Sequence, residues 1–207
     1  RQQPAIEDLR GARGRGAFEM IEKSLAGARA VFEGHLGCGG QAIDHGHEVL
    51  VLGDGKLGNL CAQVVNLTGA RVTALGKHAD KLALIKKTGV RTIQFNDWRP
   101  RLFDIVVEAT GSASGLELAL SAVRPRGTLI LKSTIAGNHQ VSLAPIVINE
   151  INVIGSRCGP FADALDALAA KRVAVAPLID AIYPLKDGID GLGRAGRAGA
   201  RKVLLQP

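Results

Sequence analysis

A glycine-rich hexapeptide carries the clearest chemical signal in the sequence. It is an uninterrupted G-x-G-x-x-G made of Gly53, Asp54, Gly55, Lys56, Leu57 and Gly58. An apolar run precedes it and helically spaced apolar residues follow, which is the order found in pyrophosphate-binding turns. The first glycine allows the turn, the second lets a phosphate approach the backbone, and the third lets the helix pack closely on the strand. The motif predicts a phosphate-bearing ligand at the start of the helix, with a ligand-free turn as the alternative.

The end of the second apolar run bears on which dinucleotide would bind. A site for NAD usually has Asp or Glu there, which holds the ribose 2′-hydroxyl. This sequence has Gly76, Lys77 and His78, and Lys81 follows as a further candidate for cofactor binding. The missing carboxylate leaves room for a 2′-phosphate, which Lys77 and His78 can neutralise. We therefore expect NADP to be preferred to NAD; a solvent-exposed loop lysine is the alternative interpretation of Lys77.

The elements that must position these residues alternate regularly along the chain. Strands are expected at residues 49–52, 71–75, 91–94, 103–108, 128–131 and 151–155, and helices at 57–67, 80–88, 114–123 and 161–170. Such alternation is typical of an α/β fold with a Rossmann-type, doubly wound parallel sheet and helices on both faces. Residues 1–47 are expected to form a short, irregular and partly helical N-terminal segment, with a helix at 17–30 and a glycine-rich stretch at 34–40.

The composition excludes several classes of protein. Hydrophobic residues make up 46% and charged residues 22%, as in ordinary globular chains. No apolar run approaches the roughly 18 residues of a membrane span, and aromatic residues, at 3%, are too few for recognition of single-stranded nucleic acid by stacking. The net charge is +7, and residues 48–207 carry all of the excess. Because the cationic residues are scattered, they favour an exposed basic surface or a phosphate-bearing ligand over nucleic acid.

The cysteines indicate a cellular compartment. Cys38, Cys61 and Cys158 are odd in number and scattered, so they predict neither a disulfide framework nor a zinc knuckle. This usage is typical of a reducing cytoplasm. No apolar signal-peptide region is visible near the first residue.

Five segments together resemble a known family. They are VLVLGDGKLG, ARVTALGKHADKLAL, FDIVVEATGSASGLELAL, RPRGTLILKST and NEINVIGSRCG. In this order they resemble the dinucleotide-binding domain of the medium-chain (zinc-type alcohol) dehydrogenases, from about residue 48 onward. The resemblance implies that the ends of the fourth, fifth and sixth strands border the nicotinamide. The matching residues are Ala109, Thr110, Gly111, Ser133, Thr134, Ser156, Arg157 and Cys158.

The same resemblance implies a division into domains and a set of partners. Residues 1–47 would be a remnant of the catalytic domain with its linker helix, residues 48–178 the NAD(P)-binding domain, and residues 179–207 a tail that returns to the catalytic domain. Members of the family commonly pair through the last strand of this sheet, so we expect a homodimer through residues 151–155. We expect a small-molecule alcohol or carbonyl substrate, and neither nucleic acid nor membrane as a partner.

Zinc belongs to the intact family, whose Cys, His and Glu ligands lie in a catalytic domain that does not fit into 47 residues. Glu33, His35, Cys38, His45 and His47 lie close together in this sequence and include zinc-type donors. We interpret them as polar residues of a connecting segment and predict no metal site. Glu33 is the single candidate ligand, because the family often has a glutamate near the metal just before the linking helix.

Three hypotheses for function remain. The first is a fragment or subunit of an NAD(P)-dependent alcohol or polyol dehydrogenase, an enzyme by family resemblance. The second is a non-catalytic dinucleotide-binding module that has lost the zinc domain, which the missing ligands favour. The third is an S-adenosylmethionine methyltransferase, whose glycine loop is similar, but an acidic residue would then be expected where Gly76 stands.

Overall fold

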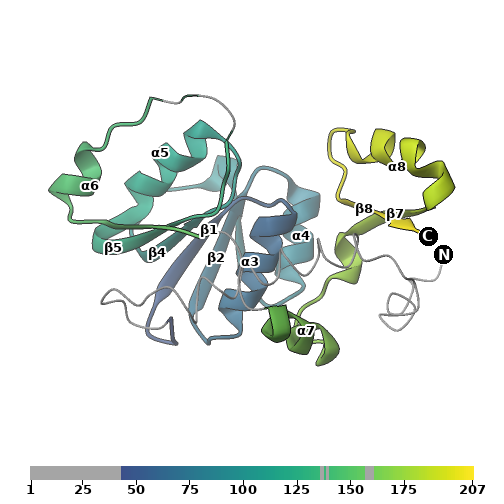
Figure 1. Ribbon diagram of the computed structural model, residues 1–207. Helices are drawn as coiled ribbons and strands as arrows, with labels where there is room; N and C mark the ends of the chain where they lie inside the picture. The colour runs from purple at the N-terminus through teal and green to yellow at the C-terminus, as the bar shows by residue number, and fades with distance from the viewer. Residues whose placement is uncertain (1–42, 136–137, 139, 157–160) are drawn as a thin grey trace.

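A six-stranded parallel sheet forms the centre of the computed structural model, which describes residues 43–135, 138, 140–156 and 161–207 (Figure 1). Its strands are β1 (Glu48–Leu52), β2 (Arg71–Gly76), β3 (Arg91–Gln94), β4 (Phe103–Glu108), β5 (Val123–Leu131) and β6 (Asn152–Gly155). Their order across the sheet is β3-β2-β1-β4-β5-β6, which is the doubly wound order of dinucleotide-binding folds. The predicted fold class is confirmed.

Helices cover both faces of this sheet. The helices are α3 (Lys56–Asn66), α4 (Ala79–Lys86), α5 (Ala113–Ala122), α6 (Ala144–Ile148) and α7 (Phe161–Ala169). Buried residues of α3, α4 and α7 pack in one hydrophobic cluster, and those of α5 pack in a second cluster with α6 beside it. The sequence predicted all of these helices except α6, within a few residues of their observed ends.

β1 shows why its sequence reads as a continuous apolar run. Val49 and Val51 belong to the cluster under α3, whereas Leu50 and Leu52 belong to the cluster under α5. All four side chains are at most 1% exposed. A parallel strand covered on both faces needs apolar residues at every position, so alternation is lost.

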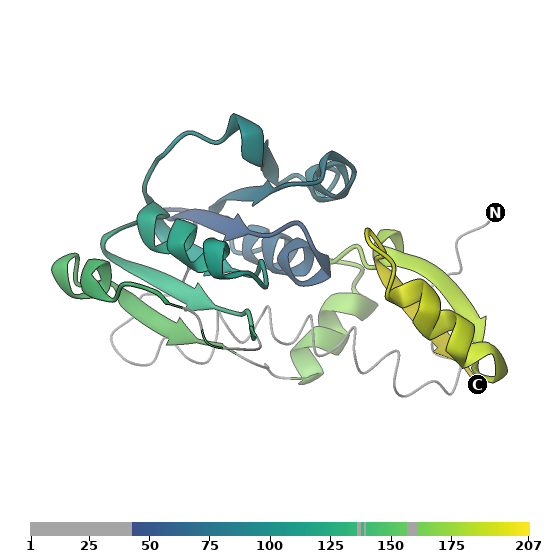
Figure 2. The same cartoon turned by 90° about the horizontal axis from the view of Figure 1, so that it is seen from above.

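A second, two-stranded parallel sheet follows the main one. It consists of β7 (Ile179–Pro184), α8 (Gly188–Ala195) and β8 (Lys202–Gln206). Figure 2 shows this unit beside the main sheet, at the end near the start of α3. α8 lies close to the strands because Gly191 has no Cβ, which would otherwise lie 2.8 Å from Leu205 and 3.4 Å from Tyr183. The sequence predicted only a tail at residues 179–207, so this β-α-β unit is a finding of the structure.

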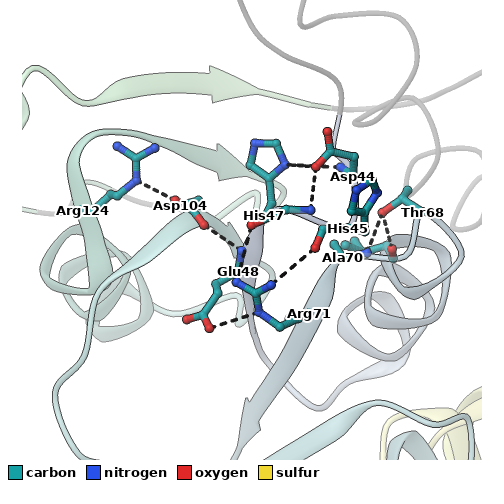
Figure 3. Close-up of polar contacts among 11 residues, drawn as sticks. Asp44, His45, His47, Glu48, Thr68, Ala70, Arg71, Asp104 and Arg124 are labelled. Atoms are coloured by element: carbon teal, nitrogen blue, oxygen red, sulfur yellow. Dashed lines mark hydrogen bonds and ion pairs between the residues drawn. The ribbon is translucent and has the colours of Figure 1, made fainter.

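Polar contacts fasten the amino ends of the central strands (Figure 3). The Glu48 backbone N–H donates to Asp104 at 2.7 Å, and Arg124 donates to the other oxygen of that carboxylate, also at 2.7 Å. Burial raises the pKa of Asp104, but the hydrogen bonds from Glu48 and Arg124 outweigh it and hold the pKa below its usual range. Arg71 completes the contacts by pairing with the Glu48 carboxylate at 3.3 Å. β1, β2 and β4 are therefore joined at their amino ends, opposite the glycine loop.

The N-terminal segments and the start of the fifth strand need separate comments. The helix expected at 17–30 and the glycine-rich stretch at 34–40 lie outside the described residues. β5 begins at Val123 and not at residue 128, and its register with β4 shifts near Phe103. In the part of the chain that the structure describes, no helix is long and apolar enough to cross a membrane.

Substituting Gly58 with alanine should destabilise the fold. A Cβ there would lie 1.9 Å from the carbonyl oxygen of Gly53, so helix and turn would have to separate. We expect a loss of at least about 1–3 kcal/mol in the free energy of unfolding, measured in urea. Gly193→Ala in α8 is the matched control, because its Cβ would meet nothing within 4 Å. The control should gain up to about 1 kcal/mol, and a Gly58→Ala protein as stable as this control would contradict the close approach.

Candidate functional site

The glycine loop joins the end of β1 to the start of α3 in a turn that only glycine can form. Gly53 has a φ of +114°, and a Cβ there would lie 2.6 Å from the carbonyl oxygen of Ala109. Gly55 precedes the first residue of α3, and no side chain caps the helix. A Cβ on Gly55 would meet nothing within 4 Å. The first turn of α3 therefore faces open space with backbone N–H groups that suit an anion.

Two cavities meet at this loop. The first, which we call the loop cavity, has a volume of about 430 Å³ and lies between the ends of β1 and β2. The second, the strand-end cavity, has a volume of about 450 Å³ and lies at the ends of β4 and β5. Gly55, Ala109 and Thr110 line both cavities. An elongated ligand could thus extend from one cavity to the other across the start of α3.

Most of the residues predicted from the sequence line one of these cavities. Those in the loop cavity are Gly53, Asp54, Gly55, Gly76, Lys77, His78, Lys81, Ala109 and Thr110. Those in the strand-end cavity are Gly55, Lys56, Leu57, Ala109, Thr110, Gly111, Ser133 and Thr134. Gly58 and Ser156 line neither cavity; Gly58 acts through packing, and the Ser156 hydroxyl accepts a hydrogen bond from Lys132, a residue of the strand-end cavity, at 3.3 Å. Arg157 and Cys158 lie outside the described residues.

A buried carboxylate holds the loop after β4. Glu108 is 1% exposed, and its Oε1 accepts hydrogen bonds from the Thr110 backbone N–H at 2.7 Å and from the Thr110 hydroxyl at 2.5 Å. The next residue, Gly111, has a φ of +70° and donates its N–H to the Ser133 hydroxyl at 2.8 Å. These bonds connect the ends of β4 and β5. Glu108 was not among the predicted site residues, because its role depends on this contact and not on a motif.

A second carboxylate, that of Asp54 in the glycine loop, lies beside the end of β2, although β2 itself has no acidic residue there. Asp54 Oδ2 accepts a hydrogen bond from the His78 backbone N–H at 2.6 Å, and His78 Nδ1 lies 3.1 Å from both Asp54 oxygens. A Cβ on Gly76 would lie 2.5 Å from the Asp54 side chain. Lys77, on the same edge, places its ammonium 5.7 Å from the centre of the Phe95 ring. The glycine loop therefore brings a negative charge to a place where the sequence predicted only positive ones.

The strand-end cavity is positively charged. Its described lining residues include Lys56, Lys132 and Lys202 and no acidic side chain. Lys202 is 8% exposed, and burial, together with the charge of Lys56, lowers its pKa to about 8. β8 directs the Lys202 side chain into this cavity and away from bulk solvent.

The other basic residues near Lys202 have different roles. Arg194 and Arg201 both pair with Asp180, at 2.6 and 3.1 Å. They hold α8 and the start of β8 against β7, and both guanidinium groups share the one Asp180 carboxylate within this unit. Of Arg194, Arg201 and Lys202, it is Lys202 that lines the strand-end cavity.

The described residues do not provide a zinc site. His47 Nδ1 is bonded to the Asp44 carboxylate at 2.9 Å, at the edge of the sheet opposite the cavities (Figure 3). Within the described ranges, no three His, Cys, Asp or Glu residues are grouped so that they could hold a metal ion. Burial raises the pKa of the Cys61 thiol to about 12, which makes it a poor ligand and nucleophile. The donors Glu33, His35 and Cys38 lie outside the described residues.

Comparison with known proteins gives the family. The family model for zinc-binding dehydrogenases matches residues 57–171, more than half of the chain. The chain belongs to the zinc-binding dehydrogenase family. The predicted resemblance is thereby confirmed, and the match covers α3, β2 to β6 and α7.

Individual relatives agree with this assignment. D-arabinitol dehydrogenase 1 of Uromyces fabae is 26% identical over 222 aligned positions, which cover 95% of this chain and 63% of that protein. L-idonate 5-dehydrogenase of Escherichia coli has a TM-score of 0.79 at 23% identity, with 95% of this chain and 59% of that chain covered. An NADP-bound structure assigned to the zinc-binding dehydrogenases of Sinorhizobium meliloti has a TM-score of 0.77 at 23% identity, with 90% and 58% covered. This chain therefore spans about three-fifths of the length of these three relatives.

The pKa of Lys202 predicts how anion binding depends on pH. Its ammonium is fully charged well below pH 8 and loses its proton as the pH rises through about 8. Binding of NAD⁺, whose pyrophosphate keeps its charge in this range, should weaken about fivefold between pH 7 and pH 9. In Lys202→Met the affinity should be lower and nearly independent of pH. Lys186→Met, an exposed control, should keep the pH dependence of the wild type. If the affinity of the wild type for NAD⁺ did not change with pH, the charge of Lys202 would not contribute to binding.

Proposed function

We propose that residues 48–178 bind a nicotinamide dinucleotide, and that the chain is the cofactor-binding part of an NAD(P)-dependent dehydrogenase of alcohols or polyols. The observation that carries this proposal is the pair of cavities that meet over Gly55 at the uncapped start of α3. Ligands of doubly wound sheets bind at the carboxyl ends of the strands, on a helix amino terminus. Membership of the family adds the expectation of hydride transfer, because a bound nicotinamide supplies that chemistry itself.

The two cavities suit the two halves of the cofactor. The loop cavity at the end of β2 would take the adenosine, and the pyrophosphate would lie across Gly55, with Lys202 close by. The strand-end cavity would take the nicotinamide, with Thr110, Ser133 and Thr134 along its wall. Ser156, Arg157 and Cys158 are proposed to extend this border after β6. The role of this chain is to bind and orient the cofactor and to exclude water from it.

The proposal also covers cofactor choice, substrate and surroundings. Gly76, Lys77, His78 and Lys81 favour NADP as the cofactor, and NADP is bound in the similar structure from Sinorhizobium meliloti. The substrate would be a small alcohol or carbonyl compound, as the relative named for arabinitol suggests. The scattered cysteines support a cytoplasmic location.

We also propose a domain division and a dimer. Residues 1–47 would belong to a catalytic domain and residues 179–207 would return to it. Copies would pair through β6, which is one of the two outer strands of the sheet and has mostly exposed residues. A monomeric mass in analytical ultracentrifugation would contradict the dimer.

A non-catalytic dinucleotide-binding module is the second candidate function. It is favoured by the described residues, which do not group into a metal site. The two functions are separated by metal analysis together with a turnover assay on the purified chain. Stoichiometric zinc and alcohol-dependent formation of NADPH or NADH would exclude the module, whereas cofactor binding without either would support it.

Substituting Gly55 with valine should abolish dinucleotide binding and leave the fold intact. The new side chain would fill the open approach to α3, and because a Cβ there meets nothing within 4 Å, the protein itself can accommodate it. We expect the Kd for NADP⁺ and NAD⁺, measured by calorimetry, to rise at least about a hundredfold, equivalent to about 2.7 kcal/mol. Gly193→Val is the control, since it lies in open space outside both cavities. Unchanged binding in Gly55→Val would refute the assignment of the loop.

Substituting Lys77 with alanine should weaken NADP⁺ more than NAD⁺. The side chain lines the loop cavity and is exposed, so its charge is partly screened by solvent. We expect the Kd of NADP⁺ to rise about threefold to tenfold and that of NAD⁺ to change less than twofold. An equal change for the two cofactors would show that Lys77 does not contact the 2′-phosphate.

A further inference from the structure

We propose that Asp54 determines which ribose the loop cavity accepts. Its carboxylate occupies the place that an acidic residue at the end of β2 would fill, and it lowers the affinity for a 2′-phosphate relative to a 2′-hydroxyl. The inference rests on the proposed dinucleotide binding and adds a specificity-determining residue to it.

The packing around Gly76 locates the carboxylate. A Cβ on Gly76 would lie 2.5 Å from both Cβ and Oδ2 of Asp54 and 2.7 Å from its Cγ. Two side chains cannot occupy this space together. A carboxylate can therefore stand at this corner on a residue of β2 or on the glycine loop, and in this chain it stands on the loop.

Hydrogen bonds to His78 hold Asp54 in a fixed orientation. The His78 backbone N–H donates to Oδ2 at 2.6 Å, and the ring Nδ1 lies 3.1 Å from both carboxylate oxygens. The Asp54 side chain is only 9% exposed. A carboxylate has about four acceptor positions, so these contacts leave capacity for a further donor from the cavity that Asp54 lines.

The chemistry of the two ribose forms then differs sharply. A 2′-hydroxyl can donate a hydrogen bond to the carboxylate, which is a charge-assisted bond. A 2′-phosphate carries about −1.5 to −2 charges at pH 7 and is repelled by it. Lys77, His78 and Lys81 act in the opposite direction, but Lys77 is exposed and the His78 ring already contacts Asp54. The Asp54 side chain is more buried than those of Lys77 and His78, so its charge is less screened and reduces the preference for NADP that these cations give.

The first test is Asp54→Asn. Asparagine has nearly the same shape, and its carbonyl oxygen can still accept from the His78 N–H. The Kd values of NAD⁺ and NADP⁺ are measured on the full chain by calorimetry. We expect the ratio Kd(NADP⁺)/Kd(NAD⁺) to fall about tenfold or more relative to the wild type. Asp190→Asn, which removes the same charge from an exposed position on α8, should leave the ratio unchanged.

The second test moves the carboxylate back to the strand. The double variant Asp54→Gly with Gly76→Asp vacates the corner and refills it from β2. Its ratio should return to within about threefold of the wild-type ratio. Gly76→Asp alone should lose affinity for both cofactors, because the new side chain and Asp54 compete for one space.

The outcomes of these two tests separate the role of Asp54 from the proposed dinucleotide binding. If Asp54→Asn leaves the ratio unchanged, or changes both Kd values equally, the role of Asp54 is refuted while dinucleotide binding stands. A double variant that keeps the ratio of Asp54→Asn also refutes it. If the wild-type chain binds neither cofactor, the proposed function fails and this inference fails with it.

Discussion

The approach of α3 to the end of β1 is the contact on which the rest of the site depends. Gly58 and Gly53 lie so close that a single methyl group between them would lie 1.9 Å from a carbonyl oxygen. This contact fixes the direction of the helix and aims its uncapped first turn at the place where the two cavities meet. A helix amino terminus attracts anions only where no side chain covers it, and the open space at Gly55 fulfils that condition.

Buried polar groups hold the remaining walls. Glu108 is almost fully buried, which would be costly for a carboxylate without hydrogen bonds. It is matched by both donors of Thr110 and thereby shapes the loop after β4. Asp54 is held at the end of β2 in the same way by His78. In both cases backbone N–H groups at the end of a strand donate to the carboxylate and fix the position of the side chain.

The sequence predicted the fold well where local pattern and buried packing coincide. The apolar run of β1 and the glycines after it identify the first strand, the turn and the helix, because two-sided burial and a close approach both restrict residue types. The unit formed by β7, α8 and β8 was missed, because its strands pair across the glycine-rich residues 188–199, which read as turns. Lys202 and Glu108 were missed for a related reason, since their roles come from contacts distant in the sequence. The position of the Asp54 side chain could not be predicted either, because in the sequence Gly76 indicates only that a carboxylate is missing at the end of β2.

The hydrogen bond from the Lys56 ammonium to the Arg201 carbonyl links residues 145 positions apart. The last strand of the main sheet ends at Gly155, well before Arg201 in the sequence. The strand-end cavity therefore takes part of its wall, at Leu178 and Lys202, from residues that follow the main sheet. A chain that ended between β6 and β7 would contain all six strands of the main sheet and lack this side of the cavity.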